Sequence, residues 1–380
     1  MPLKKIKQIT GLFFFMGALG VLLKVYAGFY NSGIYSSDNI FEQRLQNMGK
    51  ELTGGAVGAF SSMLYPFAFL ALLLAIYHFK SFKKVSLLTI SFFGIYPIIE
   101  TFFMGGRTTI ALLGTTLLFV TFASYLKNTA FPVLKFKILK IKLLTLPKFL
   151  LKRKIIIPLI TVVILFIYYS ISVLDNRLTR FNYGDGVFIV WERKDYKWVK
   201  FDDEFKEEYF KYSAKDKAKT LGLLNLKHYF VHGVFEFVRL VNDLDKVSGY
   251  YYGQYQFNVF FKFFKMLGLP LKSFGELSTI VKRQAVYQTF WGPFYIDFGI
   301  FGIVIAFFWG RFVKRVYIKA KMGSTPHVIF YGYLATVIVT SFYINFLMGS
   351  SSYFLFAFLI SLAVFKYWPP NLKFVADWEQ

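Results

Sequence analysis

Apolar residues of this chain occur in runs of about 20, the length that an α-helix needs to cross the hydrocarbon core of a membrane. Charged residues separate the runs; Asp38, Glu42 and Arg44, for example, stand between the first and the second. The pattern predicts an all-α integral membrane protein with about eight transmembrane helices, if not more. The candidate spans are 11–30, 57–79, 85–104, 108–126, 155–174, 289–310, 327–347 and 352–367.

Composition agrees with a membrane protein. Hydrophobic residues make up 56% of the 380 positions and charged residues only 17%, whereas soluble domains have about 25% charged residues. The chain has no cysteine, which excludes disulfides, thiolate metal ligands and a cysteine nucleophile. P-loop, dinucleotide-binding and G-x-S-x-G motifs are also missing from the sequence.

One long segment without a span divides the chain. Residues 1–174 contain five predicted helices, residues 175–288 form a large extracytoplasmic loop, and residues 289–380 contain three more helices. A long loop on a membrane scaffold is usually functional. In its first part Phe201, Phe205, Tyr209 and Tyr212 follow helical spacing, which predicts a helix lying on the outer leaflet.

Charge gives the predicted orientation. With the N-terminus in the cytoplasm, nearly all of the net charge of +24 falls in cytoplasmic segments, as the positive-inside rule requires. The basic segment 127–154 alternates Lys with apolar residues and is typical of an interfacial helix on the inner leaflet. The excess charge therefore indicates contact with anionic membrane lipid and not with nucleic acid. Both termini are predicted to be cytoplasmic.

A narrow polar stripe marks the stretch LKHYFVHGVFEFVRLVNDLDK, residues 226–246. At 100° per residue, five ionisable side chains fall within 80° on an otherwise apolar helix. They are His228, His232, Glu236, Arg239 and Asp243. Such a stripe predicts a wet site enclosed by protein or lipid. The alternative is a surface helix with i,i+4 charge pairs.

Zinc is a poor fit to the stripe. The metalloprotease pattern needs a glutamate directly after the first histidine, and Tyr229 stands there instead. Arg239 on the same face would repel a cation. We therefore expect no metal ion and no other cofactor.

Several arginines are predicted at the outer membrane surface, where flanking segments normally avoid them. Arg107 lies between two glycines and the start of a predicted helix, a corner that suits a phosphate or pyrophosphate. Its alternative is a tight turn in which Arg107 snorkels or pairs with Glu100. Together with Arg177, Arg180 and Arg283 it could hold an anionic lipid headgroup.

The stretch RQAVYQTFWGPFYIDFGIFGIVIAFF, residues 283–308, resembles the bacterial oligosaccharide repeat-unit polymerases, the O-antigen polymerase or Wzy family. The matching residues are Val286, Tyr287, Thr289, Tyr295, Asp297, Phe298, Gly299 and Gly302, with Gln288 interrupting a Tyr-Thr pair. The blocks GGRTTIALL, HGVFEFVRL and YYGQYQF are similar to other parts of that family.

The resemblance implies a GT-C-like helical core in the bacterial cytoplasmic (inner) membrane, with the active site on its periplasmic face. It implies a metal- and nucleotide-independent glycosyltransferase that moves a growing glycan from undecaprenyl pyrophosphate to the non-reducing end of a new lipid-linked repeat unit. The product would be O-antigen or a capsular or exopolysaccharide. A chain-length regulator and a flippase would be its partners.

Roles for individual residues follow from that reaction. Glu236 or His232 would activate the acceptor hydroxyl, and Arg239 would complete the catalytic group. The four outer arginines would stabilise the leaving pyrophosphate. Sugars would stack on aromatic side chains of the loop; we single out Tyr251, Tyr252 and Tyr287.

Asp297 is the remaining candidate. We expect it about 12 Å into the sixth span, facing the bundle interior and paired with Arg107 or Arg283. Gly299 and Gly302 would let a neighbouring helix approach closely. The ion pair could be catalytic or purely structural.

Three alternative functions remain open. An O-antigen ligase-like glycosyltransferase would share the same plan. A flippase or transporter of lipid-linked oligosaccharides would usually show more spans, internal repeats and short loops. A membrane scaffold would have no active site.

Overall fold

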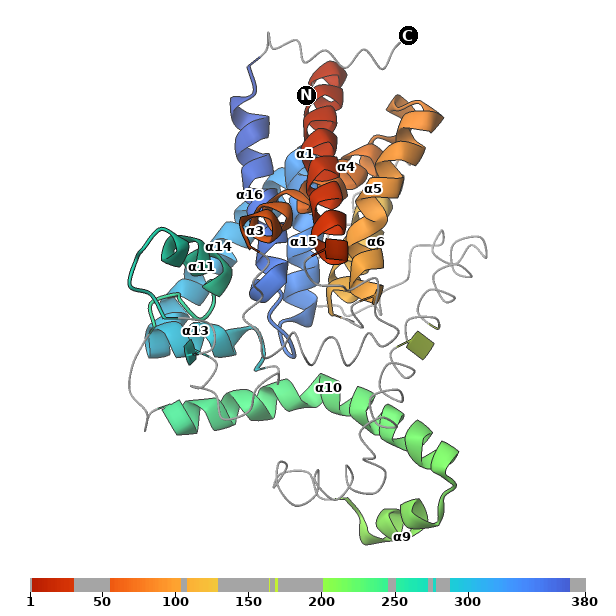
Figure 1. The fold of residues 1–380 in the computed structure, drawn as a ribbon, viewed down its shortest axis with the longest axis vertical. Coiled ribbons are helices and arrows are strands. Elements are labelled where there is room, and N and C mark those ends of the chain that lie inside the picture. Colours follow the sequence, from red (N-terminus) through yellow and green to blue (C-terminus); the bar gives the residue numbers. More distant parts are fainter. Residues whose placement is uncertain are drawn as a thin grey trace, which may run out of the picture. The chain divides into compact units, whose positions relative to one another are not determined.

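The chain is described by a computed structural model. It describes residues 2–30, 55–103, 108–128, 164, 168–169, 201–244, 251–272, 276–277 and 288–369, and every regular element within these ranges is a helix (Figure 1). The basic segment 127–154, apart from its first two residues, and most of the predicted span 155–174 lie outside the described residues. Two compact units are present, one formed by residues 1–130 and 232–380 and the other by residues 131–231.

Five helical segments of the first unit are long and apolar enough to cross a membrane. They are α1 (Leu3–Tyr30), the segment Val57–Tyr77, the segment Lys84–Thr101 of α5 (Lys84–Phe103), Trp291–Lys321 and Gly349–Tyr367. Two shorter apolar helices, α6 (Thr108–Asn128) and α15 (Thr325–Thr340), accompany them. Helices thus cover seven of the eight predicted spans in whole or in part, and the described residues are compatible with an all-α membrane protein.

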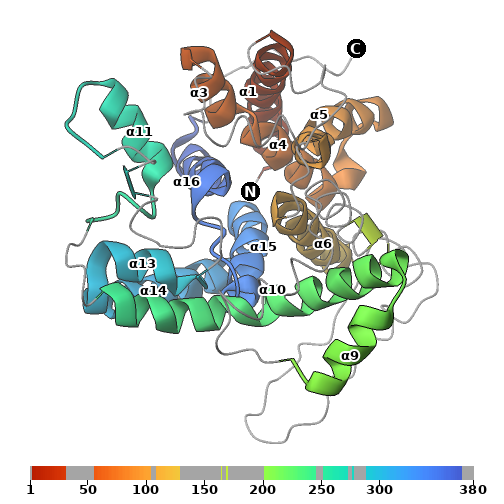
Figure 2. The ribbon, with the colours of Figure 1, turned by 60° about the horizontal axis from the view of Figure 1, so that its bottom comes forward.

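The helix α4 (Pro66–Tyr77) forms the centre of this unit. It directly continues α3 (Gly55–Leu64) and packs against α1, α5 and α6 (Figures 1 and 2). Small residues permit these contacts: a Cβ on Gly17 would collide with the backbone of Ala68, and one on Gly94 would lie 2.5 Å from the Cβ of Leu72. Such glycine contacts let apolar helices pack where no hydrophobic effect drives them together.

Aromatic rings fill the core between α15 and α16 (Ser352–Tyr367). Phe330 stacks on Phe358 with ring centroids 5.6 Å apart, and Tyr333 lies 4.7 Å from Phe358. All three side chains are fully buried. The predicted span 327–347 ends earlier than expected, because the helix stops at Thr340 and the following residues form a turn and an irregular segment.

The predicted span 289–310 is wrong as a single helix. The chain forms α13 (Trp291–Phe298), a short 3-10 turn (Gly299–Phe301) and α14 (Gly302–Lys321). The rings of Phe290 and Trp309 lie 5.9 Å apart, whereas a straight helix would separate these positions by about 28 Å. Helix α13 therefore folds back on α14, and α14 alone has the length of a span.

In the second unit, α9 (Asp203–Lys211) packs on the first half of α10 (Ala214–Leu244). Ser213 caps α10, with its hydroxyl 3.2 Å from the N–H of Asp216. Tyr209 is fully buried with Leu221, and Phe201 and Phe205 pack around them. Aromatic residues of α9 and of the segment before it therefore pack against α10.

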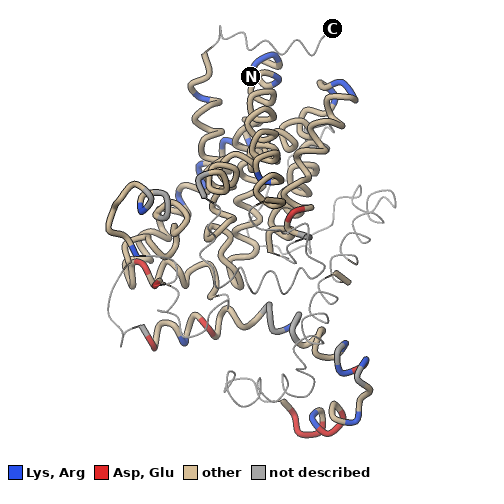
Figure 3. Tube along the Cα trace, viewed as in Figure 1, with Lys and Arg blue, Asp and Glu red and all other residues tan. Residues whose placement is uncertain are grey.

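Basic residues begin two helices of the first unit and end two others. Lys residues lie where α1 and α5 begin and where α16 ends, on the same side of the view in Figure 3. The last turn of α14 is also basic, with Lys319 and Lys321. These are the described parts of the segments that the positive-inside rule assigns to the cytoplasm.

Candidate functional site

Arg239 is the centre of a charge cluster on α10. Its Nε and Nη2 atoms donate to Oε2 of Glu236 at 2.9 and 2.7 Å, and its Nη1 donates to Oδ2 of Asp243 at 2.9 Å. These bonds hold the guanidinium along the helix and use three of its five N–H groups. The sequence periodicity correctly placed these three residues on one face.

This polar stripe is the buried side of α10 within the first unit. His232 and Glu236 are each 3% exposed, whereas Phe235 and Val238 on the other side are 44% and 50% exposed. A solvated surface helix would show the reverse burial. The stripe side of α10 is therefore more buried than its apolar side, and it also carries the i,i+3 and i,i+4 charge pairs that the alternative predicts.

Close backbone contacts fix this part of α10. A Cβ on Gly233 would lie 2.8 Å from the carbonyl oxygen of Tyr343 and 3.3 Å from the backbone nitrogen of Thr289. Further along, the rings of Phe237 and Tyr295 are 6.0 Å apart, so α10 and α13 lie side by side (Figure 2). The glycine thus lets the stripe reach the start of α13.

Thr289 has an unusual backbone at this contact. Its φ of 61° lies in the left-handed region, which a β-branched residue rarely adopts. Its hydroxyl accepts the N–H of Trp291, the first residue of α13, at 3.2 Å. Strained residues of this kind concentrate at functional sites.

Asp297 lies at the end of α13 and is fully buried. Its two carboxylate oxygens accept the backbone N–H groups of Tyr255 at 3.0 Å and Gln256 at 2.7 Å. The N–H of Tyr252 also donates to its backbone oxygen at 3.1 Å. The carboxylate therefore holds the turn at 251–257, whereas its expected pairing with Arg107 or Arg283 involves residues outside the described ranges.

The two glycines after Asp297 lie at the reversal between α13 and α14. Gly299 has φ 54° and ψ −137°, a conformation that forms this reversal. A Cβ on Gly302 would lie 3.5 Å from the carbonyl oxygen of Phe294, an ordinary van der Waals contact between α14 and α13.

The turn held by Asp297 carries two of the predicted glycan-binding residues. Tyr252 is 75% exposed and has a positive φ of 51°, and Gly253 follows with φ 92°. Tyr251 is half-buried, with the ammonium of Lys272 4.7 Å from its ring centroid. Burial, together with the charge of Asp297, raises the pKa of Tyr255 to about 12. The turn therefore presents one open aromatic face, that of Tyr252.

The carboxamides of Asn345 and Gln256, which the sequence analysis did not single out, connect the 251–257 turn to the segment after α15. Asn345 donates to Oε1 of Gln256 at 2.8 Å and to the carbonyl of Phe290 at 2.9 Å, and its own oxygen accepts the N–H of Leu347. It thereby ties the segment after α15 to the turn and to α13. No local pattern marks a contact between positions 89 residues apart.

The remaining predicted residues lie outside the description. Arg107, Arg177, Arg180, Arg283 and Tyr287 belong to segments that are not described, as does the side chain of His228. Glu100, the suggested alternative partner of Arg107, is paired with Lys24. Among the described residues, His, Asp and Glu form no group of three that could hold a metal ion.

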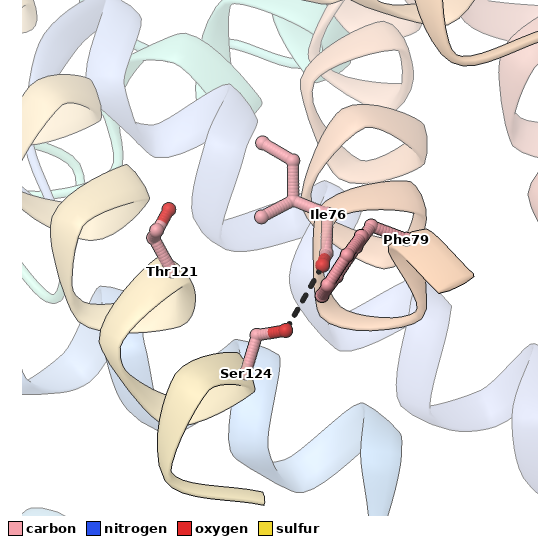
Figure 4. A pocket seen from close by; sticks show the side chains of 4 residues that line it. All are labelled: Ile76, Phe79, Thr121 and Ser124. Atoms are coloured by element: carbon pink, nitrogen blue, oxygen red, sulfur yellow. Dashed lines mark hydrogen bonds between the residues drawn. The ribbon is translucent and has the colours of Figure 1, made fainter. Parts of the chain in front are cut away.

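A separate hollow lies between α4 and α6. Ile76, Phe79, Thr121 and Ser124 line it, and the hydroxyl of Ser124 donates to the carbonyl of Ile76 at 3.1 Å (Figure 4). None of its lining residues is ionisable, so it offers no acid, base or charge for a reaction. The α10 stripe remains the stronger candidate.

Comparisons with known proteins find no match. No protein-family model matches the sequence, and no curated protein or solved structure does either. The interpretation of the site therefore depends on its geometry and on the sequence resemblance.

Proposed function

We propose that this protein polymerises lipid-linked oligosaccharide repeat units. One observation carries the proposal: three sequence blocks that carry the family resemblance pack together although they are distant in sequence. Leu240 from the first block, Tyr255 from the second and Ile296 from the third are buried in one cluster. Their joint packing is what a shared active site would require.

The reaction is a displacement at the anomeric carbon of the donor sugar. The acceptor hydroxyl oxygen forms the new glycosidic bond while the bond to the lipid pyrophosphate breaks. Glu236 or His232 takes the hydroxyl proton, since both lie on the buried stripe. Undecaprenyl pyrophosphate leaves with the bonding electron pair, and its growing negative charge needs cationic donors.

Arginines supply that stabilisation. Arg239 has two N–H groups beyond its three hydrogen bonds, and its orientation is fixed by Glu236 and Asp243. A preorganised donor of this kind stabilises charge without reorganising during the reaction. Arg107, Arg177, Arg180 and Arg283 would bind the pyrophosphate.

Sugar rings would stack on Tyr252, the open aromatic face of the turn, with Tyr251 and Tyr287 as further contacts. The distribution of basic residues supports a site on the outer face of the membrane with both termini in the cytoplasm, and we assign that face to the periplasmic side of a bacterial inner membrane as part of the proposal. A flippase would supply the lipid-linked unit there, and a chain-length regulator would limit the product. No metal ion or cofactor is needed, because the pyrophosphate donor is already activated.

The test is polymerisation in detergent by purified protein, with synthetic polyprenyl-pyrophosphate repeat units and EDTA present. We expect a ladder of products on a gel. Arg239→Ala should reduce its formation by at least about 100-fold, as loss of a charge-stabilising donor does elsewhere. The matched control is Arg315→Ala, which removes an exposed arginine from α14 and should leave the ladder unchanged.

Other outcomes favour the alternatives. Transfer of glycan only to a different acceptor would indicate a ligase-like enzyme. Movement of the lipid-linked unit across liposomes without a ladder would indicate a flippase. A ladder of normal intensity from folded Arg239→Ala protein would contradict the role given to the stripe.

A further inference from the structure

A second charged group lies inside the helix bundle, away from the proposed site. The ammonium of Lys24 in α1 is 3.6 Å from Oε1 of Glu100 in α5. It donates to the hydroxyl of Ser62 at 2.9 Å and lies 5.0 Å from the ring centroid of Tyr65. Ionisable residues within apolar helices are costly and are a functional hypothesis by default.

The two charges differ in access. The side chain of Lys24 is 22% exposed, whereas that of Glu100 is 7% exposed. The hydroxyl of Ser62 donates to the carbonyl of Gly58 at 2.8 Å, which leaves its lone pairs to face the ammonium. The ammonium of Lys24 is therefore more accessible from outside the bundle than the carboxylate of Glu100.

Lys24 also has donor capacity to spare. An ammonium carries three N–H groups; among the described residues Ser62 accepts one of them at 2.9 Å, and Glu100 lies 3.6 Å away as an electrostatic contact. Ser62, Glu100 and Tyr65 hold the side chain against the bundle. A fixed, partly exposed ammonium with spare donors suits an anion.

Its position along α1 indicates which anion. Lys24 lies about 31 Å along the helix from Leu3, next to Lys4 at the basic end. This distance matches the roughly 30 Å hydrocarbon thickness of a bilayer. With Lys4 at one headgroup level, Lys24 reaches the level of the phosphates in the opposite leaflet.

We propose that Lys24 binds the phosphate of a membrane lipid, with Ser62 and Glu100 positioning its ammonium. The phosphate could belong to a glycerophospholipid or to an isoprenoid pyrophosphate; both offer the same anionic oxygens. The site does not depend on polymerase activity. If the lipid is the isoprenoid, Lys24 adds a contact to the donor of the proposed reaction.

Binding to the purified full-length protein tests the proposal without turnover. Native mass spectrometry in detergent would measure farnesyl pyrophosphate and phosphatidylglycerol in separate titrations, with farnesol as the probe lacking phosphate. Lys24→Met should lower the affinity for at least one of the two phosphate-containing lipids by about tenfold, which is the usual effect of losing a hydrogen bond to a charged group. Farnesol binding should stay unchanged. The lipid that responds identifies the source of the phosphate.

Glu100→Gln distinguishes a lipid-binding lysine from a purely structural ion pair. It removes the opposing charge but leaves an acceptor for Lys24, so binding of the same lipid should strengthen by about threefold. The double variant should behave as Lys24→Met alone. A purely structural ion pair would not produce this gain.

Two variants control for folding and for general charge. Lys24→Arg keeps the charge and should retain binding, and it remains informative if Lys24→Met does not fold. Lys4→Met removes an exposed lysine from the other end of α1 and should leave the titrations unchanged. Equal effects of Lys4→Met and Lys24→Met, or no change in either phosphate lipid, would overturn the proposal.

Discussion

Within the described ranges, backbone N–H groups are the hydrogen-bond donors to the carboxylate of Asp297. Both oxygens accept backbone N–H groups of the 251–257 turn. Asparagine would place an NH₂ group against one of these donors, leaving a buried N–H unpaired. We expect Asp297→Asn to lower the free energy of unfolding by about 2 kcal/mol. Urea unfolding in detergent, followed by circular dichroism, would measure the loss.

A matched substitution separates this effect from a general loss of charge. Asp202 caps α9 at an exposed position, accepting the N–H of Glu204 at 3.4 Å. Asp202→Asn should cost less than about 0.5 kcal/mol, because asparagine is an equally good capping residue. If the two variants were equally stable, Asp297 would not be holding the turn.

At the residue scale, the sequence predicts contacts between neighbours on one helix and misses contacts with distant parts of the chain. Periodicity aligned Glu236, Arg239 and Asp243, because i,i+3 and i,i+4 neighbours share a face of any helix. For Asp297 it indicated burial but not the partner. Its donors are backbone groups about 40 residues upstream, and a backbone N–H has no sequence signature.

At the scale of elements, the reversal between α13 and α14 depends on Gly299. Its φ of 54° with ψ −137° is open to glycine and strained for residues with a Cβ. We expect Gly299→Ala to destabilise the protein by about 1–3 kcal/mol. Thermal unfolding in detergent, monitored by helical circular dichroism, would detect the shift.

Gly310 provides the matched glycine in the same hairpin. It lies inside α14, and a Cβ there would meet no atom within 4 Å. Gly310→Ala should be neutral or stabilise by up to about 1 kcal/mol, since alanine favours helix. Similar melting curves for the two variants would argue against a strained turn at Gly299.

This hairpin also shows where sequence patterns reach their limit. Residues 289–310 form a continuous apolar run, and hydropathy alone cannot distinguish one straight span from a short helix folded on a longer one. Gly299 and Gly302 signal either a turn or close helix packing. The choice depends on the packing of Phe290 on Trp309, which is a tertiary contact.

At the scale of the whole molecule, the pattern predicts an all-α membrane protein, and the described residues form helices of which several are long and apolar enough to span a membrane. Helical spans are recognisable because a bilayer requires every backbone hydrogen bond to be satisfied locally. The sequence pattern predicted less about the packing of helices within the large loop. The aromatic side chains of α9 pack on α10, and an amphipathic pattern does not reveal whether lipid or protein covers its apolar face.

Orientation gives the last prediction. Helix α14 has 20 residues, about 30 Å, and ends in the basic turn that the positive-inside rule assigns to the cytoplasm. The chain has no cysteine, so single cysteines can be introduced without background. In intact cells an impermeant maleimide should label Lys265→Cys, which lies before the hairpin, and should label Lys319→Cys only after permeabilisation. Both positions are exposed, so folding does not hide either thiol. Labelling of both cysteines in intact cells would place both on one side and contradict α14 as a span; the opposite pattern would reverse the topology and move the α10 stripe away from the periplasm.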